Sequence, residues 1–305
     1  MAVTAVSAAQ AVEAVFRIES ARIIASVARV VRDVGIAEEI ARAFLASEAT
    51  VAQRIVRAKR ALARAGVPFE VPYGADREAR LSSVLEVIYL VFNEGYSATA
   101  GDDLVRPALC EDALRLARVL AALMPEEPEA HGLAALLEFQ ASRIATRTGP
   151  DGEPVLLADQ NRSRWNRMLI HRGARALGRA GNGPYSVQAA IAGCHAAAVR
   201  YEDTDWPRIA ALYGRLVQLI PSPVVELNRA VAVSMAEGPA AALPLVDALA
   251  REPALRAYHL LPSVRGDLLE RLGRREEARA EFERAASLTR NARERTLLLG
   301  RAARL

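Results

Sequence analysis

Residues 266–278 read GDLLERLGRREEA, and this stretch gives the clearest indication of the fold. Small residues stand at Gly266, Gly273 and Ala278, and Phe282 and Ala285 follow at regular spacing. Small side chains at such points let the two helices of a hairpin approach each other closely. The stretch therefore predicts a helical hairpin near the end of the chain.

The composition favours helices throughout. Of the 305 residues, 52% are hydrophobic but only 5% are aromatic, so the core must be built mainly from Ala, Leu and Val. Ala and Leu lose little on entering a helix. Beyond residue 80, proline and glycine separate segments of about 12 to 16 residues, close to the usual helix length. The main breaks stand at Pro107, Pro125, Pro128, Pro150, Pro184, Pro207, Pro221, Pro223, Pro239, Pro253 and Pro262. We therefore predict an all-α protein that ends in stacked helical hairpins.

The spacing within residues 266–285 resembles that of a tetratricopeptide (TPR) repeat, and residues 206–237 resemble a more degenerate unit. Arrays of such repeats bind partners through a concave face. One reading of the chain is therefore a helical-repeat scaffold that binds only proteins, with a basic helix near its start that merely caps the array.

Three helices are expected before residue 66. Apolar residues recur at helical spacing over residues 9–34, and Gly35 then interrupts the pattern. A short helix is expected over residues 36–45 and a third helix over residues 48–64. Ser47 lies in the turn between them and is a suitable N-cap.

The third of these helices has two opposite faces. Val51, Ile55, Ala58 and Leu62 fall on one side of a helical wheel, and Gln53, Arg57, Arg60 and Arg64 on the other. An apolar face packed on the preceding helix, with a basic face open to a partner, is the helix-turn-helix arrangement, whose second helix enters the major groove. Gln can bind adenine and Arg can bind guanine through paired hydrogen bonds. The alternative is an amphipathic surface helix that is basic by chance in an arginine-rich protein.

Residues 39–62, EIARAFLASEATVAQRIVRAKRAL, resemble the promoter-reading half of region 4 in extracytoplasmic-function (ECF) RNA polymerase sigma factors. In that family this helix-turn-helix recognises the −35 element of the promoter. The resemblance implies that Thr50, Ala52, Gln53, Val56 and Arg57 face the bases, and that Arg54 and Arg60 face the DNA backbone. Lys59, near the flank of the same helix, suits a phosphate contact.

Other runs extend the resemblance over essentially the whole chain. Residues 11–25, AVEAVFRIESARIIA, resemble the opening helix of sigma region 2. The C-terminal extension of one ECF subgroup is similar to residues 89–99 (YLVFNEGYSAT), 159–165 (DQNRSRW), 183–188 (GPYSVQ) and 222–230 (SPVVELNRA). The resemblance implies promoter DNA and RNA polymerase core as partners. It also implies a helical extension that regulates DNA binding or recruits a further protein.

This resemblance divides the chain into four parts. Residues 1–38 are a remnant of region 2, residues 39–66 the helix-turn-helix, residues 67–80 a linker with glycine and proline, and residues 81–305 the extension. Most of region 2 and the start of region 4 are missing, because the first helix runs almost directly into the helix-turn-helix. Promoter opening needs aromatic side chains that hold unpaired bases. The first 80 residues contain only Phe16, Phe44, Phe69 and Tyr73. We therefore expect −35 binding, weakened polymerase binding and no promoter melting by this chain alone.

No pattern in the sequence predicts an enzyme, a cofactor or a metal site. The chain lacks a glycine-rich phosphate loop, a nucleophile elbow and paired catalytic carboxylates. His131, His171, His195 and His259 are dispersed and are expected to be structural or simply exposed. Cys194 and His195 are adjacent and would point about 100° apart on a helix, which makes them a poor metal pair.

Two further polar segments are residues 93–103 and residues 203–206. Residues 93–103, NEGYSATAGDD, are expected to form a loop at the start of the extension. A small-ligand sensor that uses this loop near Glu94 is a third reading of the chain. Asp203 and Asp205 are expected to begin a helix, with Trp206 packed between hairpins.

The net charge of the chain gives no strong indication of its partner. The formal net charge is +4, from 40 basic and 36 acidic residues, and such a balance does not by itself indicate nucleic acid. No charged-then-apolar run with a cleavage site predicts a signal peptide, and no apolar run reaches the ~18 residues that a spanning helix needs. We expect a cytoplasmic protein that does not contact the membrane.

Overall fold

The computed structural model describes residues 75–98 and 102–305, and every regular element in these residues is helical. The α-helices are α4 (Ala75–Tyr96), α5 (Pro107–Leu123), α6 (Pro128–Ala141), α7 (Arg167–Leu177), α8 (Pro184–Ala197), α9 (Trp206–Leu219), α10 (Pro223–Ala236), α11 (Pro239–Leu249), α12 (Leu260–Arg271), α13 (Arg275–Leu288) and α14 (Ala292–Ala303). Four short 3₁₀-helices join them: η1 (Ile144–Thr146), η2 (Arg162–Arg164), η3 (Tyr201–Asp203) and η4 (Pro253–Leu255). The prediction of an all-α fold is confirmed. The helices expected over residues 9–34, 36–45 and 48–64 lie outside the described residues.

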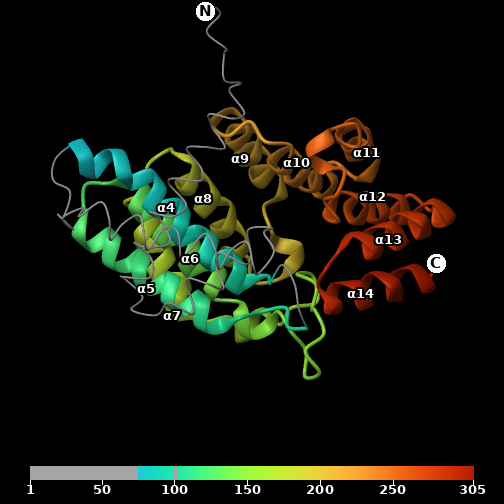
Figure 1. Cartoon of the computed structure of the whole chain (residues 1–305), viewed down its shortest axis with the longest axis horizontal. Coiled ribbons are helices and arrows are strands. Elements are labelled where there is room, and N and C mark those ends of the chain that lie inside the picture. The colour runs from blue at the N-terminus through green and yellow to red at the C-terminus, as the bar shows by residue number, and fades with distance from the viewer. Residues whose placement is uncertain (1–74, 99–101) are drawn as a thin grey trace, which may run out of the picture. The chain divides into compact units, whose positions relative to one another are not determined.

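The chain divides into two compact units, residues 1–91 and residues 92–305, and α4 spans the division. Within the second unit most helices pack on their neighbours in sequence, and α6 and α8 also pack extensively on each other (Figure 1). α6 is central to the first half of this unit, because it contacts α5, α7 and α8. From α8 onward the packing continues pairwise to α14, which gives the array of helical hairpins that the proline and glycine breaks predict.

Proline and side-chain caps explain where the helices begin. α5, α6, α8, α9, α10 and α11 each carry proline in their first two positions. Proline is favoured there because its fixed φ suits a helix and its missing N–H would have no partner in the first turn. Asn166, Asp205, Ser222 and Asn291 accept backbone N–H bonds at the starts of α7, α9, α10 and α14. The prediction that a helix begins beside Asp205 is confirmed.

α12 and α13 form the hairpin that residues 266–285 predict. A Cβ atom on Gly266 would lie 2.9 Å from Cε1 of Phe282, so only glycine lets the two helices approach as they do. Ala278, Phe282 and Ala285 are fully buried between the helices and their neighbours. Gly273 makes the turn with a φ of +78°, a left-handed conformation that glycine adopts without strain.

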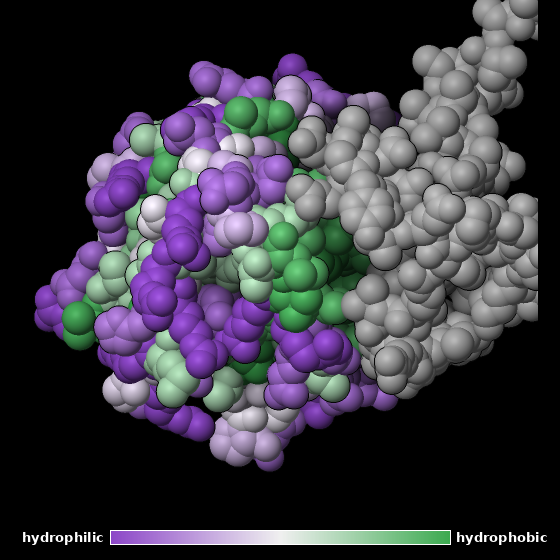
Figure 2. Space-filling model, turned by 90° about the vertical axis from the view of Figure 1, so that its left-hand side faces the viewer, coloured by the Kyte–Doolittle hydropathy of each residue, from purple (hydrophilic) through white to green (hydrophobic). Residues whose placement is uncertain are grey.

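The burial of the helices follows their sequence patterns. α6 buries ten consecutive residues from Ala130 to Phe139, as expected for a helix that is largely apolar on every side. Figure 2 shows one face of the molecule. Hydrophilic residues cover much of this face, and hydrophobic residues lie in smaller groups between them. In the part of the chain that the structure describes, no helix combines the length and apolar character needed to cross a membrane.

Two expected boundaries are wrong. α4 begins at Ala75, so residues 75–80 are helical rather than part of the linker. This run, ADREAR, contains good helix formers and no glycine or proline, which explains why the helix starts early. The polar loop expected from Asn93 begins only after Tyr96, because the last turn of α4 includes residues 93–96. Residues 67–74 of the expected linker lie outside the described residues.

The turn before α14 is bonded to the segment that follows α4. The side chain of Asn291 is fully buried, and its Nδ2 donates to the carbonyl oxygens of Ala98 at 3.1 Å and Asp103 at 3.0 Å. Its Oδ1 accepts the backbone N–H groups of Arg293 and Glu294. One buried amide therefore joins the beginning of the second unit to its last helix.

Candidate functional site

The DNA-binding residues predicted from the sequence lie outside the described residues. They are Thr50, Ala52, Gln53, Arg54, Val56, Arg57, Lys59 and Arg60. The second unit contains a different candidate site, where charged and aromatic side chains from distant segments of the chain meet.

This site is a cationic–aromatic cluster made of three arginines, two aromatic residues and one histidine. Its members are Tyr96, Arg143, Arg147, Arg162, Trp165 and His195. Tyr96 ends α4, the first two arginines flank η1, Arg162 and Trp165 belong to η2 and its C-cap, and His195 lies in the last turn of α8.

Arg162 is fixed by the end of α8. Its Nη1 donates to the carbonyl oxygens of His195 at 2.7 Å and Ala198 at 3.0 Å, and its Nη2 donates to Oγ1 of Thr204 at 3.3 Å. A guanidinium group suits this position because the last carbonyl groups of a helix lack partners and carry partial negative charge. The guanidinium carbon also lies 4.7 Å from the centre of the Trp165 ring. Arg162 is buried, and these contacts hold η2 against α8.

Two more arginines lie against Tyr96. The guanidinium carbon of Arg147 is 3.7 Å from the centre of the Tyr96 ring, and that of Arg143 is 5.5 Å away. Cations are attracted to the faces of aromatic rings, more strongly where water is excluded. Arg143 and Arg147 stand on either side of η1, so this 3₁₀ turn presents both cations to one ring.

The electrostatics of the cluster reflect its burial and its excess of positive charge. Burial lowers the pKa of Arg162, and the nearby charge of Arg143 lowers it further. Burial also lowers the pKa of His195 to about 3, with further lowering by Arg143 and Arg162. The His195 ring is therefore neutral at physiological pH. It packs edge-on against Trp206, with ring centres 5.2 Å apart.

Several polar atoms of the cluster are sealed from solvent and lack a hydrogen-bond partner in the part of the chain that the structure describes. They are the Tyr96 hydroxyl, Nε of Arg147, Nε of Arg162, Nε1 of Trp165 and Nδ1 of His195. Most buried polar groups in proteins are hydrogen-bonded, so five such atoms among neighbouring residues call for an explanation.

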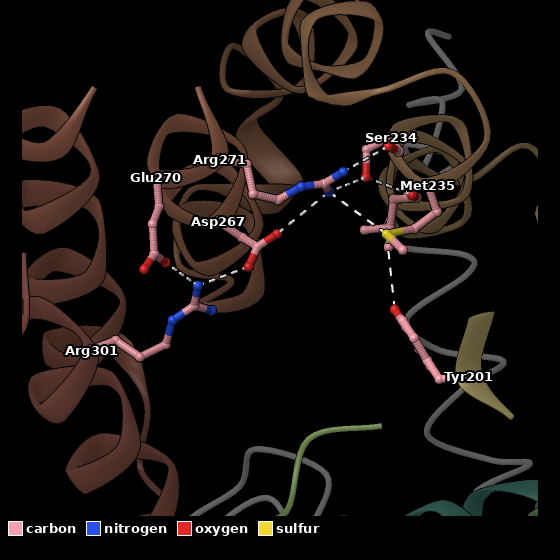
Figure 3. Close-up of polar contacts among 8 residues, drawn as sticks. Tyr201, Ser234, Met235, Asp267, Glu270, Arg271 and Arg301 are labelled. Carbon is pink, nitrogen blue, oxygen red and sulfur yellow. Dashed lines mark hydrogen bonds and ion pairs between the residues drawn. The ribbon is translucent and has the colours of Figure 1, made fainter. Parts of the chain in front are cut away.

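A polar seam continues from the cluster into the hairpins. We define the seam as Tyr201, Ser234, Met235, Asp267, Glu270, Arg271 and Arg301 (Figure 3). Arg271 of α12 reaches α10, where it donates to Oγ of Ser234 at 3.1 Å and to the Ser234 carbonyl oxygen at 3.0 Å. Arg301 of α14 donates to Asp267 at 2.8 Å and pairs with Glu270, both on α12.

Tyr201 joins the seam to the cluster. Its hydroxyl lies 3.9 Å from the sulfur of Met235, and its ring centre lies 5.8 Å from the guanidinium carbon of Arg162. The seam is largely paired internally, with each arginine matched to a carboxylate or a carbonyl group. It therefore holds three helices together, and the unpartnered donors lie in the cluster.

The other sequence-based interpretations have mixed outcomes. Trp206 packs against His195 and Tyr201 and against an apolar group of α8, α9 and α10, as expected for a residue between hairpins. Glu94 is not in a loop: it lies in α4, is buried, and forms an ion pair with Arg106 at 3.2 Å. Among the described residues, no group of three or more His, Cys, Asp and Glu side chains could hold a metal ion.

The sequence does not predict the cationic–aromatic cluster. Arg162 and Trp165 lie in residues 159–165, DQNRSRW, which indicate only a family resemblance. The signal that could indicate a site is the composition of this run, in which three polar residues precede an arginine and a tryptophan within one short turn. Nothing in the sequence pairs this run with Tyr96 or His195.

Comparisons with known proteins give a partial match. Residues 80–181 match the model of a family of unknown function (DUF6596). The chain is 51% identical over 260 residues to an uncharacterized protein of Rhizobium meliloti (strain 1021). The aligned part covers 84% of this chain and 61% of that relative, so the chain spans less than two thirds of the relative's length. No solved structure matches the chain.

Proposed function

We propose that this chain is a sigma-factor-like transcription protein that binds promoter −35 DNA through residues 39–66. The observation that carries the proposal is the pair of opposite faces on residues 48–64, one aliphatic and one with Gln53, Arg57 and Arg60. An aliphatic face can anchor the helix on its partner helix, while the basic face reaches the major groove. The resemblance of residues 39–62 to sigma region 4 supports the same assignment.

In this proposal the chain recognises DNA but does not open it. Gln53 and Arg57 read base edges, and Arg54, Lys59 and Arg60 bind phosphates. Thr50, Ala52 and Val56 contribute close packing against the bases. Because the first 80 residues hold only four aromatic side chains, they offer no platform for unpaired bases. Binding of RNA polymerase core is also weakened in this proposal, because most of region 2, which makes the main contact with the polymerase, is missing.

The helical array of the second unit is proposed to regulate this DNA binding or to recruit a protein partner. Stacked helical hairpins offer extended surfaces that suit such a role. The proposal includes no catalytic activity and no cofactor, and it places the protein in the cytoplasm, where RNA polymerase acts.

A salt titration of binding to duplex DNA tests the proposal. Contacts to phosphates release counterions, so log affinity should fall steeply and linearly with log salt concentration. Arg57→Ala should weaken binding to a −35-bearing duplex by about 1–3 kcal/mol and relax sequence preference. Arg179→Gln, which changes an exposed arginine of the second unit, is the matched control and should bind as the parent does.

A helical-repeat scaffold without DNA binding is the second candidate. The α12–α13 hairpin, closed by Gly266 and Phe282, favours it because hairpins of this kind stack into protein-binding arrays. The same titration separates the two candidates. A scaffold would show no salt-dependent binding to the duplex, and Arg57→Ala would leave its behaviour unchanged.

A further inference from the structure

The cationic–aromatic cluster contains more hydrogen-bond donors than its neighbours satisfy. The unpartnered atoms of Arg147, Arg162 and Trp165 are N–H donors, and they are joined by the Tyr96 hydroxyl and by Nδ1 of His195. These residues come from four separate segments of the second unit. An unmet buried donor costs about 1–3 kcal/mol, so several of them close together are not explained by packing alone.

The arginines of the cluster also lack ion pairs. Arg143, Arg147 and Arg162 make no ion pair with a carboxylate among the described residues. Glu202 and Asp203 act on Arg162 through their charge, and Glu294 interacts in the same way with Arg147, but neither arginine forms an ion pair with them. The hydrogen bonds of two of these acids go to other residues. Asp203 accepts two hydrogen bonds from the guanidinium group of Arg200, and Glu294 is held by Thr289 at 2.8 Å and lies 3.1 Å from Nε2 of His259.

Arg143 connects the two halves of the cluster. It lies over the ring of Tyr96, and the carbonyl oxygen of Ser142, the residue before it, accepts the backbone N–H of Asn166, the residue after Trp165, at 2.8 Å. The unpartnered donors therefore belong to one neighbourhood and not to two separate ones. Arg162 itself is held in place through Nη1 and Nη2, which leaves its Nε–H available.

We propose that the cationic–aromatic cluster is a binding site for a small oxyanion with the chemistry of phosphate. Such an ion offers acceptor oxygens and negative charge, which suit the unpartnered N–H groups of Arg147, Arg162 and Trp165 and the hydroxyl group of Tyr96. Water could accept some of these bonds, but it would add no negative charge beside three arginines that form no ion pair among the described residues. Charge-assisted hydrogen bonds from arginine to an oxyanion are also stronger than those to a neutral acceptor.

Binding of the ion would join the end of α4, the η1 turn, η2 and the end of α8 through one ligand. Because these segments are far apart in the sequence, a bound ion should stabilise the second unit as a whole by linkage. The inference does not depend on DNA binding by residues 39–66, and either proposal can fail without the other.

The test follows the indole N–H signals of the ¹⁵N-labelled full chain during titration with sodium phosphate. The chain has two tryptophans, and Trp165→Phe identifies the signal of Trp165. Sodium chloride at equal ionic strength in a zwitterionic buffer is the reference, and sodium sulfate is the second oxyanion. We expect a saturable shift of the Trp165 signal with phosphate and with sulfate but not with chloride.

Two variants test the donors directly. Arg147→Gln should raise the dissociation constant for phosphate at least about tenfold, because it removes a charged donor. Tyr96→Phe keeps the ring under both arginines and removes only the hydroxyl, so it should fold and bind several-fold more weakly. Arg179→Gln is the matched control for loss of one positive charge and should bind phosphate as the parent does.

A Trp165 signal that ignores phosphate, or that moves only in proportion to ionic strength, overturns the proposal. Equal affinities in the parent, Arg147→Gln and Tyr96→Phe also overturn it. A saturable shift that both substitutions weaken, and that the control leaves unchanged, supports it.

Discussion

The guanidinium group of Arg118 on α5 binds both carboxylate oxygens of Glu138 on α6, at 2.8 Å and 2.9 Å. The Glu138 side chain is 4% exposed and that of Arg118 is 38% exposed. α6 is the most buried helix among the described residues, and Glu138 is its one buried carboxylate. The two-point arginine contact gives both oxygens of this buried carboxylate a hydrogen-bond partner.

Loss of this pair should destabilise the second unit strongly. Arg118→Met keeps the aliphatic stem but leaves the Glu138 carboxylate buried without its partner, and we expect a loss of about 3 kcal/mol in the free energy of unfolding. Arg115→Met is the control, because its ion pair with Asp112 is exposed and should contribute less than about 0.5 kcal/mol. Urea unfolding followed by circular dichroism measures both. Equal effects of the two substitutions would contradict the assigned role of Glu138.

Two glycines in helices should respond to alanine in opposite directions. Gly266→Ala places a methyl group 2.9 Å from the Phe282 ring, which must move, and we expect a loss of about 1–3 kcal/mol. Gly300→Ala on α14 meets nothing within 4 Å, and we expect a gain of about 0.5–1 kcal/mol from the restricted unfolded chain and better helix propensity. Thermal unfolding of the two variants beside the parent gives the comparison. A gain at Gly266 would show that α12 and α13 do not depend on this close approach.

Local signals explain why much of the fold could be predicted from the sequence. Proline at the first helical positions and caps such as Asp205 act within one turn, so their effect can be judged without knowing the rest of the chain. The Gly266–Phe282 contact is similarly local, because it joins two helices that follow each other directly. The sequence does not predict the end of α4, because the run that contains Glu94 is typical of a loop. In the fold Glu94 is buried and forms an ion pair with Arg106, in the segment before α5.

The candidate site could not be predicted in the same way. Tyr96, Arg147, Arg162 and His195 are separated by loops and helices, and only the folded unit brings them together. In the sequence, each of these residues taken alone is as compatible with an ordinary structural role as with a binding site. The donors that lack partners become visible only when every buried bond of the neighbourhood is known. The expected DNA-binding residues differ, because all of them lie within one short stretch of sequence and their pattern can be seen there directly. Their role remains a prediction.

The two cysteines should differ in reactivity. Burial raises the pKa of the Cys110 thiol to about 12, and the side chain is 1% exposed and donates weakly to the Phe92 carbonyl oxygen. Burial also raises the pKa of Cys194, but this residue is only partly buried. Because the thiolate is the reactive form, iodoacetamide at pH 8 should modify Cys194 first and Cys110 only after unfolding. Mass spectrometry of peptides before and after addition of guanidinium chloride checks the order. Early modification of Cys110 would mean that α4 and α5 separate readily.

His195 should make the stability of the protein depend on pH on the acid side. Its pKa is lowered from 6.5 to about 3, mainly by burial and also by Arg143 and Arg162. The neutral ring is therefore favoured in the folded state, and this contribution is fully present above pH 6.5. As the pH falls from 6.5 toward 3, the unfolded chain takes up a proton that the folded chain does not. The free energy of unfolding should then drop by up to about 1.4 kcal/mol per pH unit.

Two histidine substitutions isolate this contribution. His195→Asn removes the titrating group, so its stability relative to the parent should improve steadily as the pH is lowered from 6.5 to 4. His171 is exposed, and His171→Asn should keep the pH dependence of the parent. Urea unfolding at a series of pH values gives each curve. Parallel curves for the parent and His195→Asn would mean that the His195 ring is protonated within the folded protein. Burial and the two guanidinium groups of Arg143 and Arg162 should prevent this.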